Sequence, residues 1–148
     1  MVGTMESKMM NGEYYLRIAK NENLMAEIRK FADRYHVCGH FTGIGAANKV
    51  IISTYIPEKH DFLDHTKEGM LEMFTLTGNV SLDDQNQPVV HAHAGFSYLN
   101  DKGDIAVIAG DLREATIGYT GEIVFTPTKE DLPRQFDPDA GIDVWKLN

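Results

Sequence analysis

The chain has 148 residues, of which 43% are hydrophobic and 24% charged, a composition typical of one soluble globular domain. Its 22 acidic and 14 basic residues give a formal net charge of -8, which argues against long-range attraction to nucleic acid or to an anionic membrane. The single cysteine, Cys38, excludes an internal disulfide. No run approaches ~18 apolar residues, and residues 1–10 lack the apolar core of a signal peptide. We therefore expect a cytoplasmic protein with no membrane partner.

The N-terminal half predicts a strand followed by one main helix. Aromatic and β-branched residues alternate at 14–18, which is typical of a strand. A helix should begin after Asn23 and end near His36, because the apolar residues between them recur at helical spacing. The segment 37–45 predicts a strand that runs into a turn containing Gly43 and Gly45. Residues 50–56 predict another strand.

The C-terminal half predicts the rest of the sheet. After a polar stretch at 58–69, residues 70–82 predict one long strand, or two with a kink at Gly78. Strands at 89–98, 105–112 and 115–126 follow. This order predicts an α+β domain, a mostly antiparallel sheet of six or seven strands with one main helix after the first strand.

We divide the chain into an N-terminal extension (1–12), a domain (13–127) and a C-terminal tail (128–148). The tail should pack on the domain or on a neighbouring subunit. Trp145 should be its buried anchor, because a lone tryptophan near a terminus gains most from burial.

The strongest functional signal lies in the run 87–94. His91 and His93 are separated by one residue on a predicted strand, so their side chains share a face. Asp111 lies at the end of the next strand-like segment. Two imidazoles and one carboxylate form an open three-ligand site for a divalent metal, with zinc as the first candidate and manganese or iron as alternatives. In a simpler interpretation, the histidines only bond to neighbouring backbone or to Glu72.

Other residues could support such a site. Glu72 lies in an apolar strand, where an unpaired carboxylate is costly, so it should pair with Arg113 or with a histidine behind the metal ligands. Alternatively, Arg113 forms an ordinary exposed ion pair with Glu114. Gly43 and Gly45 form either a ligand loop or a tight turn with close backbone approach at an interface, since Gly-x-Gly alone is a weak phosphate motif.

Several motifs in order resemble the PPC domain, shared by plants and prokaryotes, in its stand-alone prokaryotic form. They are Gly43-Ile-Gly45-Ala, Leu71-Glu-Met-Phe-Thr-Leu-Thr-Gly78-Asn-Val-Ser, Gln87-Pro-Val-Val-His91-Ala-His93 and Ala109-Gly-Asp111-Leu112. The resemblance covers about 13–127. It implies an α+β fold with a mostly antiparallel sheet, a homotrimer assembled through that sheet, and a role in binding a protein partner.

Two differences from the family bear on function. Plant members carry an Arg-Gly-Arg-Pro segment that enters the minor groove of DNA, and this chain has none. The family usually reads Gly-Gly-His-Leu at 109–112, so Asp111 replaces the third histidine of a possible three-histidine cluster. A carboxylate remains a good ligand for zinc, manganese or iron.

Two main hypotheses follow, and the sequence leaves open whether the protein is an enzyme. The first is a trimeric PPC-like binding or regulatory module, associated with DNA through a partner, with a metal or small ligand at His91, His93 and Asp111. The second is a metal-dependent hydrolase or lyase that activates a metal-bound water, with Glu72 as candidate base. Direct DNA binding would need a basic face, and the only basic cluster is interleaved with acidic residues: Arg17, Lys20, Arg29, Lys30 and Arg34.

Overall fold

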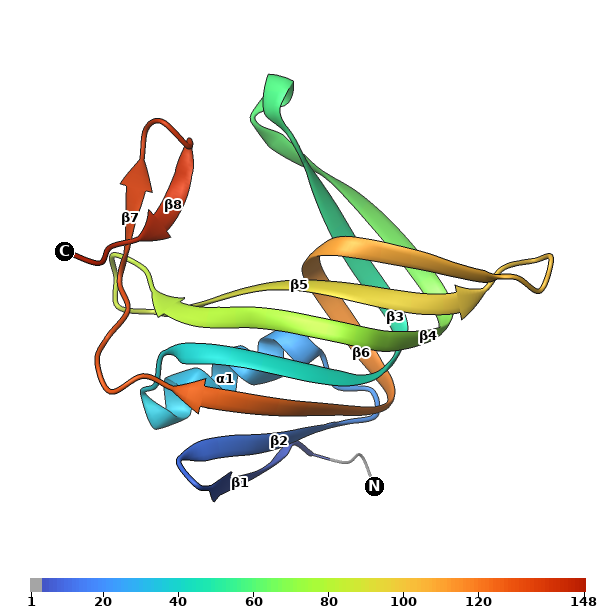
Figure 1. Ribbon diagram of the computed structural model, residues 1–148, viewed down its shortest axis with the longest axis horizontal. Coiled ribbons are helices and arrows are strands. Elements are labelled where there is room, and N and C mark those ends of the chain that lie inside the picture. The colour runs from blue at the N-terminus through green and yellow to red at the C-terminus, as the bar shows by residue number, and fades with distance from the viewer. Residues whose placement is uncertain (1–3) are drawn as a thin grey trace.

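The computed structural model describes residues 4–148, so residues 1–3 of the expected N-terminal extension lie outside the described range (Figure 1). The elements are β1 (Glu6–Met10), β2 (Glu13–Ala19), α1 (Leu24–Tyr35), β3 (Gly39–Ile56), the 3-10 helix η1 (Pro57–Lys59), β4 (Asp61–Leu82), β5 (Pro88–Leu99), β6 (Ile105–Pro127), β7 (Arg134–Asp137) and β8 (Ile142–Trp145). In this part of the chain, no helix is both long and apolar enough to cross a membrane.

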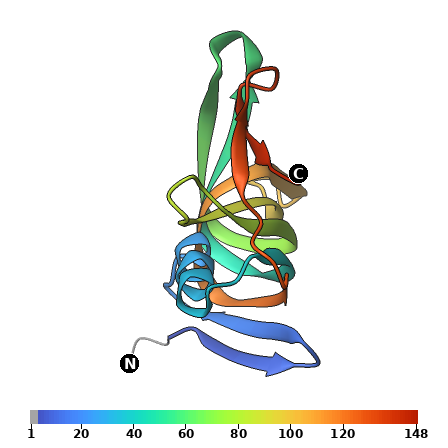
Figure 2. The ribbon, with the colours of Figure 1, turned by 90° about the vertical axis from the view of Figure 1, so that its left-hand side faces the viewer.

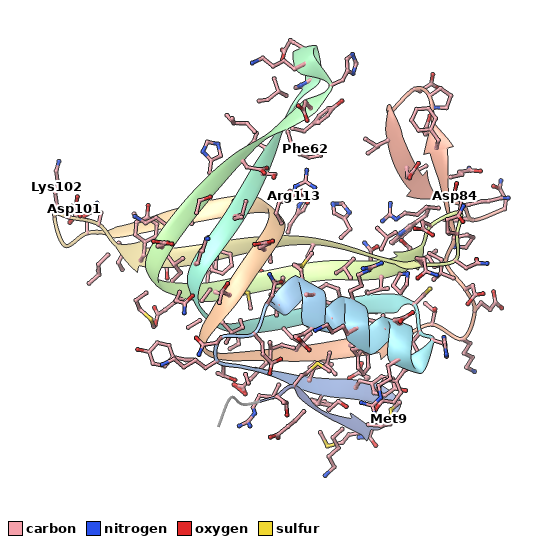
Figure 3. All side chains as sticks on the ribbon, turned by 180° about the vertical axis from the view of Figure 1, so that it is seen from behind. Met9, Phe62, Asp84, Asp101, Lys102 and Arg113 are labelled. Atoms are coloured by element: carbon pink, nitrogen blue, oxygen red, sulfur yellow. The ribbon has the colours of Figure 1, made fainter. Side chains whose placement is uncertain are left out.

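Six strands form one antiparallel sheet in the order β1-β2-β6-β3-β4-β5. An additional pairing of β5 with β6 joins β3, β4, β5 and β6 into a closed ring of four strands. The helix α1 covers one face of the sheet and stands in front of it in Figure 3. The predicted fold class, a mostly antiparallel α+β domain with one main helix, is confirmed.

The helix forms where its apolar residues predict it. The Asn23 side chain accepts a hydrogen bond from the Ala26 amide at 3.1 Å and so caps the first turn. His36 ends the helix in the left-handed conformation. The buried face of α1 packs on the sheet, where the ring of Phe31 meets that of Phe125 edge-on at 5.4 Å.

Three strands are longer than the sequence predicts. The prediction of a turn at Gly43 and Gly45 is wrong, because β3 continues through both residues. The pairing register of β3 shifts between these two glycines and again beyond Gly45. A Cβ at Gly45 would collide with the carbonyl oxygen of Thr120 on β6, so this glycine permits close backbone approach inside the sheet. The break expected near residues 113–114 is also absent, since β6 runs from Ile105 to Pro127.

The polar stretch expected at 58–69 is in fact mostly strand. Its residues pair with the second half of β3 to form a two-stranded arm that extends from the body at the top of Figure 1. Nearly all side chains of β4 from Asp61 to Met70 are exposed, so no alternation of polar and apolar residues marks the strand. The sequence does not predict β1 for the same reason, because all five of its residues are exposed.

The C-terminal tail forms a β7–β8 hairpin that rises from the same side of the body as the arm and stands apart from it (Figure 1 and Figure 2). Trp145 is 44% exposed in the single chain and so is not buried there, but its Nε1 donates to Asn79 Oδ1 on β4 at 3.4 Å. Arg134 contacts the same strand: its side chain donates to Ser81 Oγ, and to Asn79 Oδ1 at 3.2 Å. The hairpin therefore docks through polar contacts with β4.

Candidate metal centre

The pairing of β5 with β6 brings the predicted cluster together. His93 is directly opposite Asp111, and His91 lies two residues earlier on the same face of β5. Asp111 Oδ1 is 3.3 Å from His91 Nε2 and 3.8 Å from His93 Nε2. One nitrogen or oxygen from each of the three residues lies within 4.8 Å of the others.

These separations fit a first coordination shell. Zinc holds nitrogen and oxygen ligands at about 2.0–2.2 Å in tetrahedral geometry, which places neighbouring donor atoms roughly 3.3–3.6 Å apart. The two contacts to Asp111 lie at or near that range. Side-chain exposure is 50% for His91, 69% for His93 and 19% for Asp111, so an ion held there would keep open positions toward solvent.

The surroundings of His91 favour the neutral imidazole, the form that binds a metal. Burial is the largest influence and lowers the pKa of the His91 imidazole, while Asp111 opposes that shift and His93 and Arg134 add to it. A lowered pKa keeps the ring neutral at pH 7. Only the neutral ring offers a lone pair to a metal ion.

The second oxygen of Asp111 faces Arg113. Arg113 Nε lies 4.0 Å from Asp111 Oδ2 and donates to Ser53 Oγ at 2.9 Å. Its guanidinium carbon lies 4.4 Å from the centre of the Phe62 ring, and Figure 3 shows the two residues next to each other. Ser53 is buried and donates in turn to Asp64 Oδ1. Arg113 thus occupies a position behind the cluster.

Glu72 does not lie behind the cluster. It is exposed, and it pairs across β4–β5 with Ser97, four residues beyond His93 or about 13 Å along the strand. No ion pair joins Glu72 to Arg113 or to either histidine among residues 4–148. The expectation that Glu72 supports the ligands or acts as base there is therefore corrected.

The cluster opens into a groove of about 740 Å³. His91 and Asp111 line it together with residues of α1, the arm and the C-terminal hairpin. Three arginines from separate elements line it as well: Arg29, Arg113 and Arg134. A second hollow, of about 400 Å³, lies on the other side of His91 and is lined by His40, Asn79 and Trp145 among others.

Sequence reasoning missed several residues around the cluster. Ser53 and Asp64 reach it through the arm, a strand pair that the polar composition of 58–69 concealed. Arg29 and Arg134 reach the groove from a helix and from the tail. Their place depends on long-range docking, for which no local periodicity gives a signal.

Comparison with known proteins places the chain in a family. The sequence profile of the Plants and Prokaryotes Conserved (PCC) domain matches residues 5–129, most of the chain. The chain belongs to this plant- and prokaryote-conserved (PPC) family. A search of the curated proteins found no match.

Solved structures share the PPC fold over nearly their full length. A protein from Bacteroides thetaiotaomicron described as a "putative DNA-binding protein" has a TM-score of 0.88 at 23% identity, over 98% of this chain and 99% of that one. A PPC protein from Pyrococcus horikoshii has 0.79 at 26%, over 100% and 98%. A metal-containing protein from Archaeoglobus fulgidus has 0.80 at 25%, over 97% and 99%.

Proposed function

We propose that this chain is a metal-binding PPC module that holds one divalent ion on His91, His93 and Asp111. The observation that carries the proposal is the spacing of the donor atoms, 3.3 and 3.8 Å from Asp111 Oδ1 to the two imidazoles. The similarity to a metal-containing PPC-fold protein from Archaeoglobus fulgidus supports it. Imidazole and carboxylate ligands suit zinc first, and manganese or iron as alternatives.

Arg113 has a supporting role in this proposal. Its Nε lies 4.0 Å from the oxygen of Asp111 that faces away from the histidines. A positive charge there orients the carboxylate, as partners behind metal ligands do. Ser53 and Phe62 hold the guanidinium in place.

We also propose that the module is a homotrimer assembled through the sheet. Large apolar side chains stand exposed on its strands, including Ile44 on β3, Phe74 on β4, and Leu99 and Ile105, which face each other across β5–β6. Exposed apolar side chains of this size on a sheet are the kind of surface that an interface between subunits would cover. Sedimentation of the purified protein at three times the monomer mass is the expected result, and a monomer would contradict it.

Any association with DNA is proposed to go through a protein partner. The relative from Bacteroides thetaiotaomicron suggests a DNA-related role, but the net charge of -8 opposes direct contact with phosphates. We therefore expect no retardation of duplex DNA in a gel at low salt. Retardation that weakens steeply with added salt would contradict this expectation.

The open cluster favours a second candidate function, that of a metal-dependent hydrolase or lyase. A divalent ion with free positions supplies a Lewis acid for such chemistry when bound. The adjoining groove of about 740 Å³ gives a substrate access to the cluster. Since Glu72 lies elsewhere, its replacement by glutamine should leave any such activity unchanged.

Zinc binding by matched variants tests the main proposal. Untagged protein is stripped of metal and titrated with zinc in a calorimeter, alongside Asp111→Ala and Glu72→Ala. We expect one zinc per chain in the parent and in Glu72→Ala, and at least tenfold weaker binding in Asp111→Ala. Equal affinity in all three proteins would refute the site, because both variants lose one carboxylate but only Asp111→Ala loses a ligand.

A further inference from the structure

Three arginines line the groove beside the cluster, and all are fixed in the same way. Arg29 Nε donates to the carbonyl of Pro88 at 3.2 Å, and Arg113 Nε donates to Ser53 Oγ at 2.9 Å. Arg134 Nε donates to Ser81 Oγ. Each guanidinium is thus held through its Nε atom, and this hydrogen bond fixes the direction in which its two Nη atoms point.

The outer nitrogens of two of these arginines are free. Among residues 4–148, no acceptor contacts the Nη1 or Nη2 atoms of Arg29 or Arg113, whereas those of Arg134 bind Asp143 and Asn79. A fixed guanidinium with free Nη atoms presents parallel donors, which match the two oxygens of a carboxylate or phosphate. Arg29 and Arg113 therefore present preoriented Nη donors in one groove, and Arg113 does so while its Nε lies 4.0 Å from Asp64 and Asp111.

The charge balance in the groove depends on the ion. The charged residues that line it are the three arginines and three carboxylates, Asp111, Glu114 and Asp143, so the groove without metal is close to neutral. A divalent ion on the cluster would give it a net positive charge. This charge, with a volume of about 740 Å³ in the range of small-molecule sites, favours a small anion over an extended polymer.

We propose that the groove binds a small molecule through an oxyanion group, a carboxylate or a phosphate, gripped by Arg29 and Arg113 while the rest of the ligand reaches the ion on His91, His93 and Asp111. This assignment rests on the proposed metal site, since the ion supplies the excess positive charge. It names the ligand class of that site.

Calorimetric titration of zinc-loaded protein tests the assignment, with inorganic phosphate as the ligand in one series and malonate in the other. The variants are Arg29→Gln and Arg113→Gln, and Arg17→Gln is the control, because Arg17 lies on β2 paired with Glu6 outside this groove. We expect one of the two anions to show saturable binding, weakened at least tenfold in both groove variants and unchanged in the control. Which anion binds tells a carboxylate ligand from a phosphate.

Other outcomes separate this inference from the proposed function. Zinc content near one per chain with no binding of either anion overturns the ligand class and leaves the metal site intact. Binding that Arg29→Gln leaves unchanged also overturns it, and this variant is decisive because Arg29 does not touch the cluster. Failure of the parent protein to hold zinc overturns the metal site itself. Tighter binding of a DNA duplex than of either small anion would overturn the small-ligand assignment.

Discussion

Replacing Arg134 by methionine should release the β7–β8 hairpin from the body. The side chain makes two hydrogen bonds across that junction, to Ser81 and Asn79, and methionine keeps its bulk but neither bond. Hydrogen bonds from a charged group contribute ~1.5–3 kcal/mol each when buried, and Arg134 is only partly buried. We therefore take about 1 kcal/mol for each, or about 2 kcal/mol in total.

A loss of about 2 kcal/mol raises the population of the undocked hairpin roughly 30-fold, since ~1.4 kcal/mol is a factor of ten. An undocked two-stranded hairpin is itself marginally stable in water. Hydrogen exchange followed by mass spectrometry should then show peptides from 134–146 exchanging about 30 times faster, with the strands β3 to β6 unchanged. Arg17→Met, which removes an exposed arginine paired with Glu6, is the control and should change neither region.

Two results would refute this reasoning. If residues 134–146 exchange at the parent rate, the remaining contacts, such as the Leu82 amide to the Leu132 carbonyl at 2.8 Å, are enough to hold the tail. If the strands of the body exchange faster too, the hairpin and body unfold together and the docking energy cannot be assigned to one side chain.

Three further predictions concern residues away from the cluster. Glu22→Gln should raise the melting temperature at pH 7, because burial raises the pKa of Glu22, whose two buried carboxylate oxygens lack partners in the described chain. A raised pKa means that the charged carboxylate costs stability as pH rises, so the gain in melting temperature should vanish near pH 4. A gain that does not depend on pH would contradict this prediction. Gly45→Ala should lower the free energy of unfolding by ~1–3 kcal/mol through its collision with Thr120, and an unchanged denaturant midpoint would exclude that. Because burial raises the pKa of the Cys38 thiol, its reaction with a disulfide reagent near pH 8 should be slow, at the rate at which the protein unfolds. Immediate labelling of the folded protein would contradict this prediction, because it would show that the reagent reaches the thiol.

The sequence predicted the cluster because its geometry is local. The short turn between β5 and β6 aligns Leu99 with Ile105, and antiparallel pairing from that point places His93 opposite Asp111. Alternation along β5 then adds His91 to the same face. The β5–β6 hairpin and the alternation of side chains along β5 were enough to bring the three ligands together.

The rest of the groove depends on contacts that sequence periodicity does not report. Arg29 and Arg134 arrive from the helix and the tail. One hydrogen bond to the carbonyl of Pro88 orients Arg29, and hydrogen bonds to Ser81 and Asn79 on β4 orient Arg134. Hydrophobicity is a poor guide to the tail, because Trp145 remains 44% exposed and both it and the charged Arg134 contact β4 through hydrogen bonds. The sequence alone leaves a tight turn and a close backbone approach open for Gly43 and Gly45, because either one needs a residue without a Cβ; in the structure β3 approaches the backbone of β6 at both positions.

The misplacement of Glu72 has a similar cause. A carboxylate in an apolar, alternating strand needs a partner only where its own face of the strand is buried. In the structure, Leu71 and Met73 point into the core and Glu72 points to solvent. One-sided burial removes the cost that suggested a partner.

Anomalous diffraction from crystals of zinc-loaded protein tests the central claim most directly. We expect one strong zinc peak per chain within about 2.0–2.2 Å of a nitrogen of His91, a nitrogen of His93 and an oxygen of Asp111. Zinc bound at other residues, with His91 and His93 contacting Asp111 alone, would contradict the account.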